Sequence, residues 1–308
     1  MTKTSEFQPY FTARESGLLM PDGSSASLSS ENGSSFLAIK EQALELKALF
    51  ELHGLDTRRS PSLTKLFEDS ITLSDDWFCR RFKEPTLPIM LSAIQLDRVA
   101  TSIQSAKSDP RIREALEALL DGSINILDNH RTKAKDTQWE LDVYYLLNLH
   151  GLKVKLDEPD ITVDIDGEPV GIACKKFYSE SNVSKVTSEA VKQIESAGGT
   201  GIVAMNLDAI VVNEIPMRAR AIEDISQTLA SRNEEFLTRH QGTIRRYLPS
   251  GRALSALVSS AALGEVENSK RRFYNARQTT VWFTPSLPDD KDRKMGIIYA
   301  AFKAQYPA

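Results

Sequence analysis

An acid and a lysine on either side of a short turn could together hydrolyse a phosphodiester bond. Between residues 158 and 176 the chain has Asp160 after a proline, a Val/Ile-rich run, the pair Asp166-Gly167, and a second run that ends in two lysines. Hydrolysis needs a hard cation that spreads the phosphate charge and acidifies a water, and carboxylate oxygens hold such a cation. A neighbouring lysine can orient or deprotonate that water.

The turn predicts which residues face one another. Asp-Gly favours a two-residue hairpin loop because both loop residues need positive φ. This register places Asp160 opposite Ala173 and on the same face as Lys175. Opposed Cβ atoms lie about 4.5–5.5 Å apart and diagonal ones about 7–8 Å, so the Asp160 and Lys175 side chains can reach one small site. Asp164 shares the face but lies roughly 20 Å from the position opposite Lys175, at about 3.3 Å per residue.

The segments around the hairpin read as an alternation of helices and strands. Residues 138–150 have helical apolar spacing that ends at Gly151, and residues 152–156 alternate as a strand does. After the hairpin, residues 183–197 predict a helix, a Gly-Gly pair ends it, and residues 201–205 predict a buried strand.

Residues 137–208 resemble the PD-(D/E)xK nuclease superfamily, the restriction-endonuclease-like proteins. The resemblance is carried by Glu140, Pro159-Asp160 and Ala173-Cys174-Lys175, and by the order of a Glu-bearing helix, a strand, the two motif strands, a helix and a strand. It implies an α/β fold with a central mixed sheet flanked by helices. It also implies a hydrolase that binds Mg²⁺, for which Mn²⁺ can substitute, and acts as an endonuclease on nucleic acid, with DNA favoured over RNA.

The resemblance assigns the site residues. Glu140 and Asp160 would hold the metal and Lys175 would position the water. The family usually has Asp or Glu two residues before the lysine, where this chain has Ala173. Some branches take a Glu from the following helix instead, and Glu189 has that spacing. Lys176 and Gln193 are the candidate contacts to nucleic acid.

Each assignment has a structural alternative. Glu140 could complete a capping box that begins at Thr137. Glu189 could form an ordinary surface pair with Lys185. Asp160 could belong to a turn, the two lysines could be the solvated end of a strand, and Gln193 could lie on a helix surface.

Two further hypotheses come from other functional classes. In one, the protein keeps the nuclease fold but lost hydrolysis with the acid at Ala173, and binds nucleic acid or a protein partner, since fold does not guarantee chemistry. In the other, the helical N-terminal half carries an interaction function and the α/β half is a scaffold.

Composition describes a globular chain with little general attraction for nucleic acid. The 308 residues are 41% apolar and carry a net charge of −4, so binding must come from local patches. The two cysteines and four histidines have no metal-site spacing, which argues against zinc and disulfides. No signal peptide or membrane-spanning run is evident, so we expect a cytoplasmic protein without membrane contact. A homo-oligomer is compatible with the sequence.

Three regions are predicted along the chain. Residues 1–35 are rich in Ser and Gly and are expected to be flexible. Residues 36–130 have helical spacing throughout and form the helical region. Residues 131–308 form the nuclease-like α/β domain, with a further helix at 219–239, strands at 253–262 and 279–283, and a closing helix at 295–305.

Overall fold

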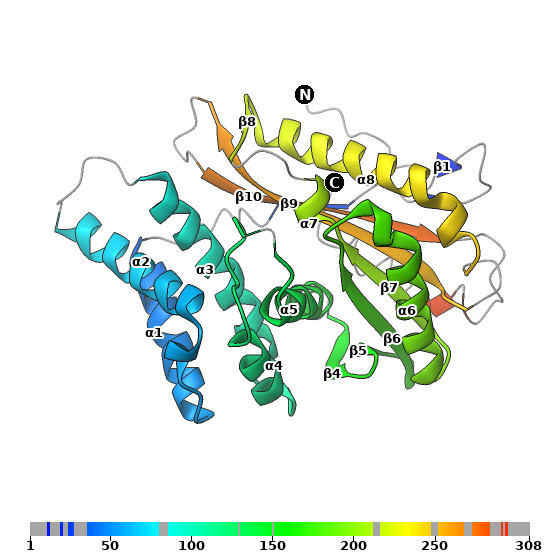
Figure 1. Ribbon diagram of the computed structural model, residues 1–308, viewed down its shortest axis with the longest axis horizontal. Coiled ribbons are helices and arrows are strands. Elements are labelled where there is room, and N and C mark those ends of the chain that lie inside the picture. The colour runs from blue at the N-terminus through cyan, green and yellow to red at the C-terminus, as the bar shows by residue number, and fades with distance from the viewer. Residues whose placement is uncertain are drawn as a thin grey trace.

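The computed structural model shows an α/β protein with helices on both faces of a sheet (Figure 1). It describes residues 11–12, 19–20, 24–27, 36–79, 86–128, 130–149, 151–211, 216–247, 252–267, 273–283, 291 and 293–294. The expected helix at 295–305 and most of the expected flexible segment at 1–35 lie outside these residues. None of the described helices is long and apolar enough to cross a membrane.

The N-terminal region is helical, as predicted. It contains α1 (Phe36–Leu52), the 3₁₀ turn η1 (Thr57–Arg59), α2 (Pro61–Phe78), α3 (Leu87–Ala106) and α4 (Ile112–Leu119). Pro61 opens α2 and Pro88 stands in the first turn of α3, where a missing N–H costs no hydrogen bond and the fixed φ suits a helix. The prolines therefore mark where these helices begin.

One mixed sheet of ten strands is formed within the described residues. Its strands are β1 (Phe11–Thr12), β2 (Leu19–Met20), β3 (Ser24–Ser27), β4 (Lys153–Asp157), β5 (Asp160–Ile165), β6 (Glu168–Lys176), β7 (Gly201–Asn206), β8 (Met217–Ala219), β9 (Ser255–Val266) and β10 (Phe273–Phe283). The order is β1-β2-β10-β9-β7-β6-β5-β4, with β3 beside β10 and β8 beside β9. Strands β4, β5 and β6 are antiparallel, whereas β6, β7 and β9 run parallel. The strands predicted near 253–262 and 279–283 are confirmed as β9 and β10.

The hairpin of β5 and β6 has the predicted register. Ile165 pairs with Glu168 and Ile161 with Ile172. Asp166 and Gly167 both have positive φ, at 54° and 86°, as a two-residue loop of this kind requires. The Asp164 carboxylate accepts the Gly167 N–H at 2.7 Å, so Asp164 stabilises the turn, away from the candidate site.

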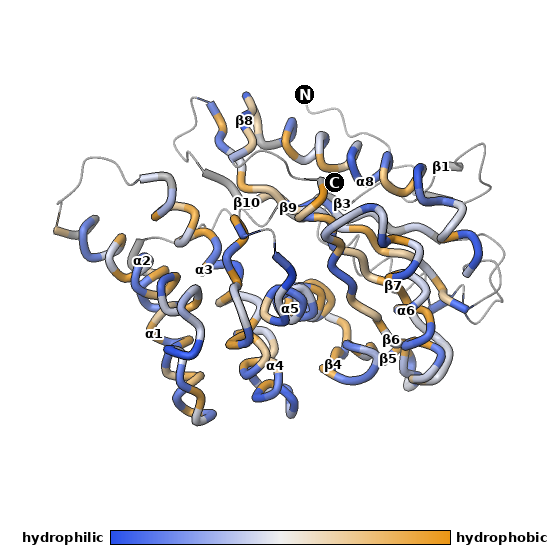
Figure 2. The backbone as a smooth tube through the Cα atoms, in the orientation of Figure 1, coloured by the Kyte–Doolittle hydropathy of each residue, from blue (hydrophilic) through white to orange (hydrophobic). Residues whose placement is uncertain are grey.

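Helices cover the sheet on both faces. α5 (Lys133–Leu149) packs on β4, β5 and β6, while α6 (Val183–Ser196) and α8 (Ile222–Ile244) pack on the opposite face (Figure 1). Figure 2 shows hydrophilic and hydrophobic residues alternating along α8, as expected for a helix with one buried face. The short helices η2 (Glu180–Asn182) and α7 (Asp208–Val211) follow β6 and β7.

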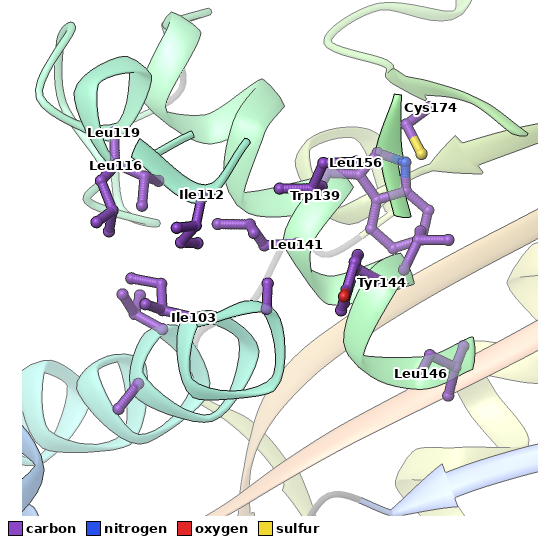
Figure 3. Close-up of a cluster of buried hydrophobic side chains, with 14 of the residues drawn as sticks. Ile103, Ile112, Leu116, Leu119, Trp139, Leu141, Tyr144, Leu146, Leu156 and Cys174 are labelled. Atoms are coloured by element: carbon purple, nitrogen blue, oxygen red, sulfur yellow. The ribbon is translucent and has the colours of Figure 1, made fainter. Parts of the chain in front are cut away.

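The main hydrophobic core joins the helical region to the sheet. Figure 3 shows part of it, where α3, α4, α5, β4 and β6 meet, with Ile103, Ile112, Trp139, Leu156 and Cys174 among its side chains. The buried Trp139 indole also donates a hydrogen bond to the Ala204 carbonyl at 3.2 Å, which ties α5 to β7. Residues on both sides of the predicted boundary near residue 130 therefore share one core, and the division into domains stays a prediction.

Candidate functional site

Asp160 is held at the first position of β5 by the backbone of the neighbouring strand. Its Oδ2 atom accepts the Cys174 N–H at 2.7 Å and lies 3.5 Å from Nζ of Lys175. Burial raises the pKa of Asp160, while the Lys175 ammonium and the Cys174 N–H oppose this rise. The structure thus brings together the acid and the lysine that the register places on one face.

Gly171 of β6 makes room for the residue before Asp160. A Cβ atom at this position would lie 2.7 Å from Cδ of Pro159 and 3.2 Å from its Cγ, closer than ordinary van der Waals contact. The ring of Pro159 therefore packs against β6 at Gly171, because only glycine lacks the Cβ atom that would clash with it. This contact fixes the entry of the chain into β5 and hence the position of Asp160.

Glu140 approaches the pair from α5. Burial raises its pKa to about 7, and the nearby Asp160 carboxylate contributes to the rise. The capping-box alternative is wrong, because α5 already begins at Lys133 and the Thr132 hydroxyl accepts the Lys135 N–H at its start. Glu140 lies well inside the helix, so its carboxylate cannot accept a hydrogen bond from one of the unpaired N–H groups at the helix start.

Glu140 and Asp160 line a common cavity of about 270 Å³ between α4, α5 and the β4–β5 connection. Its wall is mostly charged or polar: it includes Arg111, Glu114, Lys133, Thr137, Asp157 and Glu158. Arg111 forms ion pairs with Glu114 at 2.9 Å and with Asp157 at 3.4 Å. Lys133 is exposed and lines the cavity, and its positive charge lowers the pKa of Glu140 against the effect of burial.

The donors at this cavity fit a magnesium ion better than a zinc ion. The described residues contain no cluster of three or more His, Cys, Asp or Glu that could enclose a metal. Mg²⁺ does not need one, since it usually retains several waters and is held by one or two carboxylates together with substrate phosphates. Two partly buried carboxylates that repel one another, such as Glu140 and Asp160, would be stabilised by a cation between them.

No family model matches this chain, and no curated protein or solved structure matches it either. Position 173, where the PD-(D/E)xK motif has an acid, holds an alanine. Ala173 is fully buried in the apolar cluster between β6 and α6, with Phe177 and Val183. Ala173 therefore contributes to the hydrophobic core and supplies no metal ligand.

Glu189 is not brought to the cavity. Its side chain is 55% exposed on α6, lies 4.0 Å from Lys185, and does not contribute to the cavity wall. This geometry favours the surface-pair alternative over a replacement metal ligand. Gln193, one turn later, is partly buried, and its Oε1 atom has no hydrogen-bond partner among the described residues. Its expected contact with nucleic acid stays a prediction.

Lys176 requires a correction, because it lies inside the protein. Successive residues of a strand point to opposite faces, so Lys176 faces away from Asp160. Only 11% of its side chain is exposed, and Nζ donates to Asn206 Oδ1 at 3.1 Å and lies 3.7 Å from Asp208. Burial lowers its pKa, with Asp208 acting in the opposite direction. It is neither the solvated end of a strand nor a surface contact for nucleic acid.

A buried charge network surrounds Lys176 and was missed by sequence reasoning. Asp142 of α5 accepts hydrogen bonds from Arg98 Nε at 2.8 Å, from Arg277 at 3.0 Å and from Ser102 at 2.8 Å. Burial would raise the pKa of Asp142, but the two guanidinium groups hold it below its usual value. The only sign of this network in the sequence is that charged residues stand at apolar positions of α3, α5 and β10. Their pairing could not be predicted, because the partners are up to 135 positions apart in the sequence.

Proposed function

We propose that this protein is a magnesium-dependent nuclease that hydrolyses phosphodiester bonds, with DNA as the favoured substrate. The observation that carries the proposal is the approach of Lys175 to Asp160 at 3.5 Å, beside a cavity that Glu140 and Asp160 both line. Two acids that line an open polar cavity, with an amine next to one of them, are the groups that this chemistry needs.

The arrangement of elements supports a restriction-endonuclease-like core. The helix α5, the strands β4, β5 and β6, the helix α6 and the strand β7 follow one another in the order of the PD-(D/E)xK family. Glu140, Asp160 and Lys175 occupy α5, β5 and β6, as that family would require. Without these three side chains, the same order of helices and strands would support the fold but not the nuclease function.

Each residue has a distinct role in the proposed reaction. Mg²⁺, when bound, would neutralise charge on the phosphate and acidify a water. Glu140 and Asp160 would hold the ion, and the Cys174 N–H keeps the Asp160 carboxylate in place. Lys175 would orient the attacking water through its ammonium group. Lys133, exposed beside the cavity, would contact a phosphate of the substrate.

The proposal also predicts weak metal binding. Two carboxylates replace the larger acidic set that the family's motif would supply, because Ala173 contributes no oxygen ligand. We therefore expect cleavage to require Mg²⁺ at millimolar rather than micromolar concentration, with ligands completed by water and the substrate phosphate.

The test is cleavage of supercoiled plasmid and of labelled duplex oligonucleotides in Mg²⁺ or Mn²⁺. Lys175→Met and Asp160→Asn should each reduce the rate by about 10²-fold or more, as expected when a positioned proton-transfer or metal-binding group is lost. Lys185→Met is the matched control, since Lys185 is an exposed lysine paired with Glu189. Equal rates for wild type and Lys175→Met would refute the proposed function.

The missing acid at position 173 favours one alternative, a nuclease-fold protein that binds nucleic acid without cutting it. It predicts that wild type binds duplex DNA and that Lys133→Gln weakens this binding, while no metal supports cleavage. RNA oligonucleotides of the same sequence, run in parallel, decide whether DNA is the preferred nucleic acid.

A further inference from the structure

A second cavity, of about 90 Å³, lies on the other side of α5 from Glu140. It is lined by α3, the segment 124–128, α5, the end of β6, α7 and β9. Gln138 of α5 lines it, two residues before Glu140 and hence about 200° away around the helix. This cavity is therefore distinct from the one that Asp160 lines.

Gln138 presents an unused hydrogen-bond acceptor at this cavity. The residue is only 7% exposed, and its Oε1 atom has no partner among the described residues. Its Nε2 atom donates to Asp142 Oδ1 at 2.7 Å, which fixes the orientation of the amide because a flip would set the carbonyl oxygen against a carboxylate. A buried acceptor left unpaired is costly, so a ligand with an N–H or O–H donor would be favoured here.

The charges behind the cavity favour an anion. The network contains three cationic side chains, Arg98, Lys176 and Arg277, against two carboxylates, Asp142 and Asp208. Of these, Arg98, Lys176 and Asp208 line the cavity directly. Lys135 also lines it, but its Nζ is bound by the His130 carbonyl at 3.0 Å and lies 4.0 Å from Asp128, which balances its charge. Within the part of the chain that the structure describes, the network thus carries one positive charge in excess of its buried carboxylates.

The remaining wall limits the size and character of the ligand. Apart from Gln95 and Tyr178 it is apolar, with Ile94, Val99, Ile124, Ile126 and Leu263 among its residues. Since a water occupies about 30 Å³ and benzene fills an apolar cavity of about 150 Å³, the cavity holds roughly three or four non-hydrogen atoms, and because it is open to solvent the rest of a longer ligand can extend out of it. A short apolar chain with one anionic end and one donor satisfies all three parts of the wall.

We propose that this cavity binds a small organic anion that carries a hydroxyl or N–H donor, with the anionic group at Lys176 and Arg98 and the donor at Gln138 Oε1. The inference does not depend on nuclease activity. Gln42 of α1 has the same hydrogen bonding as Gln138 but lies away from the cavity. Its Nε2 donates to Asp97, its Oε1 is unpaired among the described residues, and it lines neither cavity, so it serves as a control for an unpaired amide oxygen without a binding site.

Calorimetric titration with four ligands tests the proposal on the full chain. The probe is 3-hydroxybutyrate; butyrate lacks its donor, 1,3-butanediol lacks its charge, and inorganic phosphate lacks its apolar body. We expect saturable binding of 3-hydroxybutyrate, about threefold to tenfold weaker binding of butyrate, as one lost hydrogen bond implies, and weaker binding of the other two. No saturable binding, or equal binding of all four, would overturn the proposal.

Three variants localise the binding. Gln138→Met should reduce the affinity for 3-hydroxybutyrate about tenfold and leave that for butyrate unchanged, which loss of the fold would not do. Lys176→Met leaves two cations against two carboxylates and should abolish binding of 3-hydroxybutyrate and butyrate. Gln42→Met, the matched control, should bind like wild type. If Lys176→Met binds as wild type does, or if Gln42→Met loses as much affinity as Gln138→Met, the cavity is not the site.

Discussion

The Nζ atom of Lys175 lies 3.5 Å from Oδ2 of Asp160, although 15 positions separate the two residues in the chain. The two-residue turn at Asp166-Gly167 brings them together, and the hydrogen bond from the Cys174 N–H holds the carboxylate in place. The lysine and the acid are therefore positioned by backbone geometry. Changes that shift the backbone of β5 should impair the site even when they touch neither residue.

Gly171→Ala is the sharpest change of that kind. The new Cβ would lie 2.7 Å from Cδ of Pro159, so the ring and the adjoining Asp160 must move. We expect lower stability by about 1–3 kcal/mol, typical of overpacking, and a loss of metal-dependent cleavage that persists at temperatures where the variant is fully folded. Urea unfolding and cleavage rates measure the two effects.

Gly242→Ala provides the control for Gly171→Ala. It lies in α8, where an added Cβ would meet open space, so alanine should stabilise the helix by up to about 1 kcal/mol without altering cleavage. Full cleavage activity in Gly171→Ala would show that Pro159 does not set the position of Asp160.

Ala173→Asp should have opposite effects with and without metal. Ala173 is fully buried in an apolar cluster, so a carboxylate there should lower the melting temperature in EDTA. In the register of β5 and β6 it lies opposite Asp160, which would hold Mg²⁺, so the ion should raise the melting temperature of the variant more than that of wild type. A thermal shift equal in the two proteins would place the ion elsewhere.

Asp142→Asn should be strongly destabilising. The change removes the carboxylate shared by Arg98 and Arg277 and leaves both guanidinium groups buried beside Lys176. Loss of one partner from a buried ion pair costs about 3–5 kcal/mol. Asp75→Asn is the control, because its pair with Lys40 is exposed and should contribute at most about 1 kcal/mol. Similar unfolding free energies for the two variants would contradict the buried network.

Glu140 should make the stability of the metal-free protein depend on pH. Its pKa is about 7 in the folded state and near 4.5 when unperturbed, so the folded state binds this proton more tightly than the unfolded state. The contribution of Glu140 to stability is therefore lost as pH rises from 4.5 to 7 and stays lost above 7.

Glu140→Gln removes this titration. In EDTA, the variant should gain stability relative to wild type as pH increases across that interval, as measured by urea unfolding at about pH 5, 6, 7 and 8. A difference between the two proteins that does not change with pH would mean that Glu140 ionises normally in the folded chain.

Local chemistry made the hairpin predictable from sequence, while the site as a whole needed the fold. Asp166-Gly167 determines the register, and the period of two then places Asp160 and Lys175 on one face. The apolar spacing predicts that α5 starts at residue 138, five residues after its observed start at Lys133, because the first turn of the helix is polar in sequence. That error alone made a capping box at Thr137 plausible.

The missed features depend on contacts between distant segments. Lys176 looked like a solvated strand end, and only the approach of α3 and α7 shows that Asp208 and Arg98 surround it. Glu189 matched a spacing, but spacing cannot tell which flank of α6 faces solvent. Pairings over such separations leave no periodic pattern in the sequence.

Diffraction from crystals soaked in Mn²⁺, with data collected for its anomalous scattering, would locate the ion itself. We expect a peak in the 270 Å³ cavity within coordination distance of both Glu140 and Asp160, with the Lys175 ammonium beside it, and no peak there in Asp160→Asn. A cavity without a peak, or a peak of equal height in the variant, would contradict the proposed metal site and the nuclease function built on it.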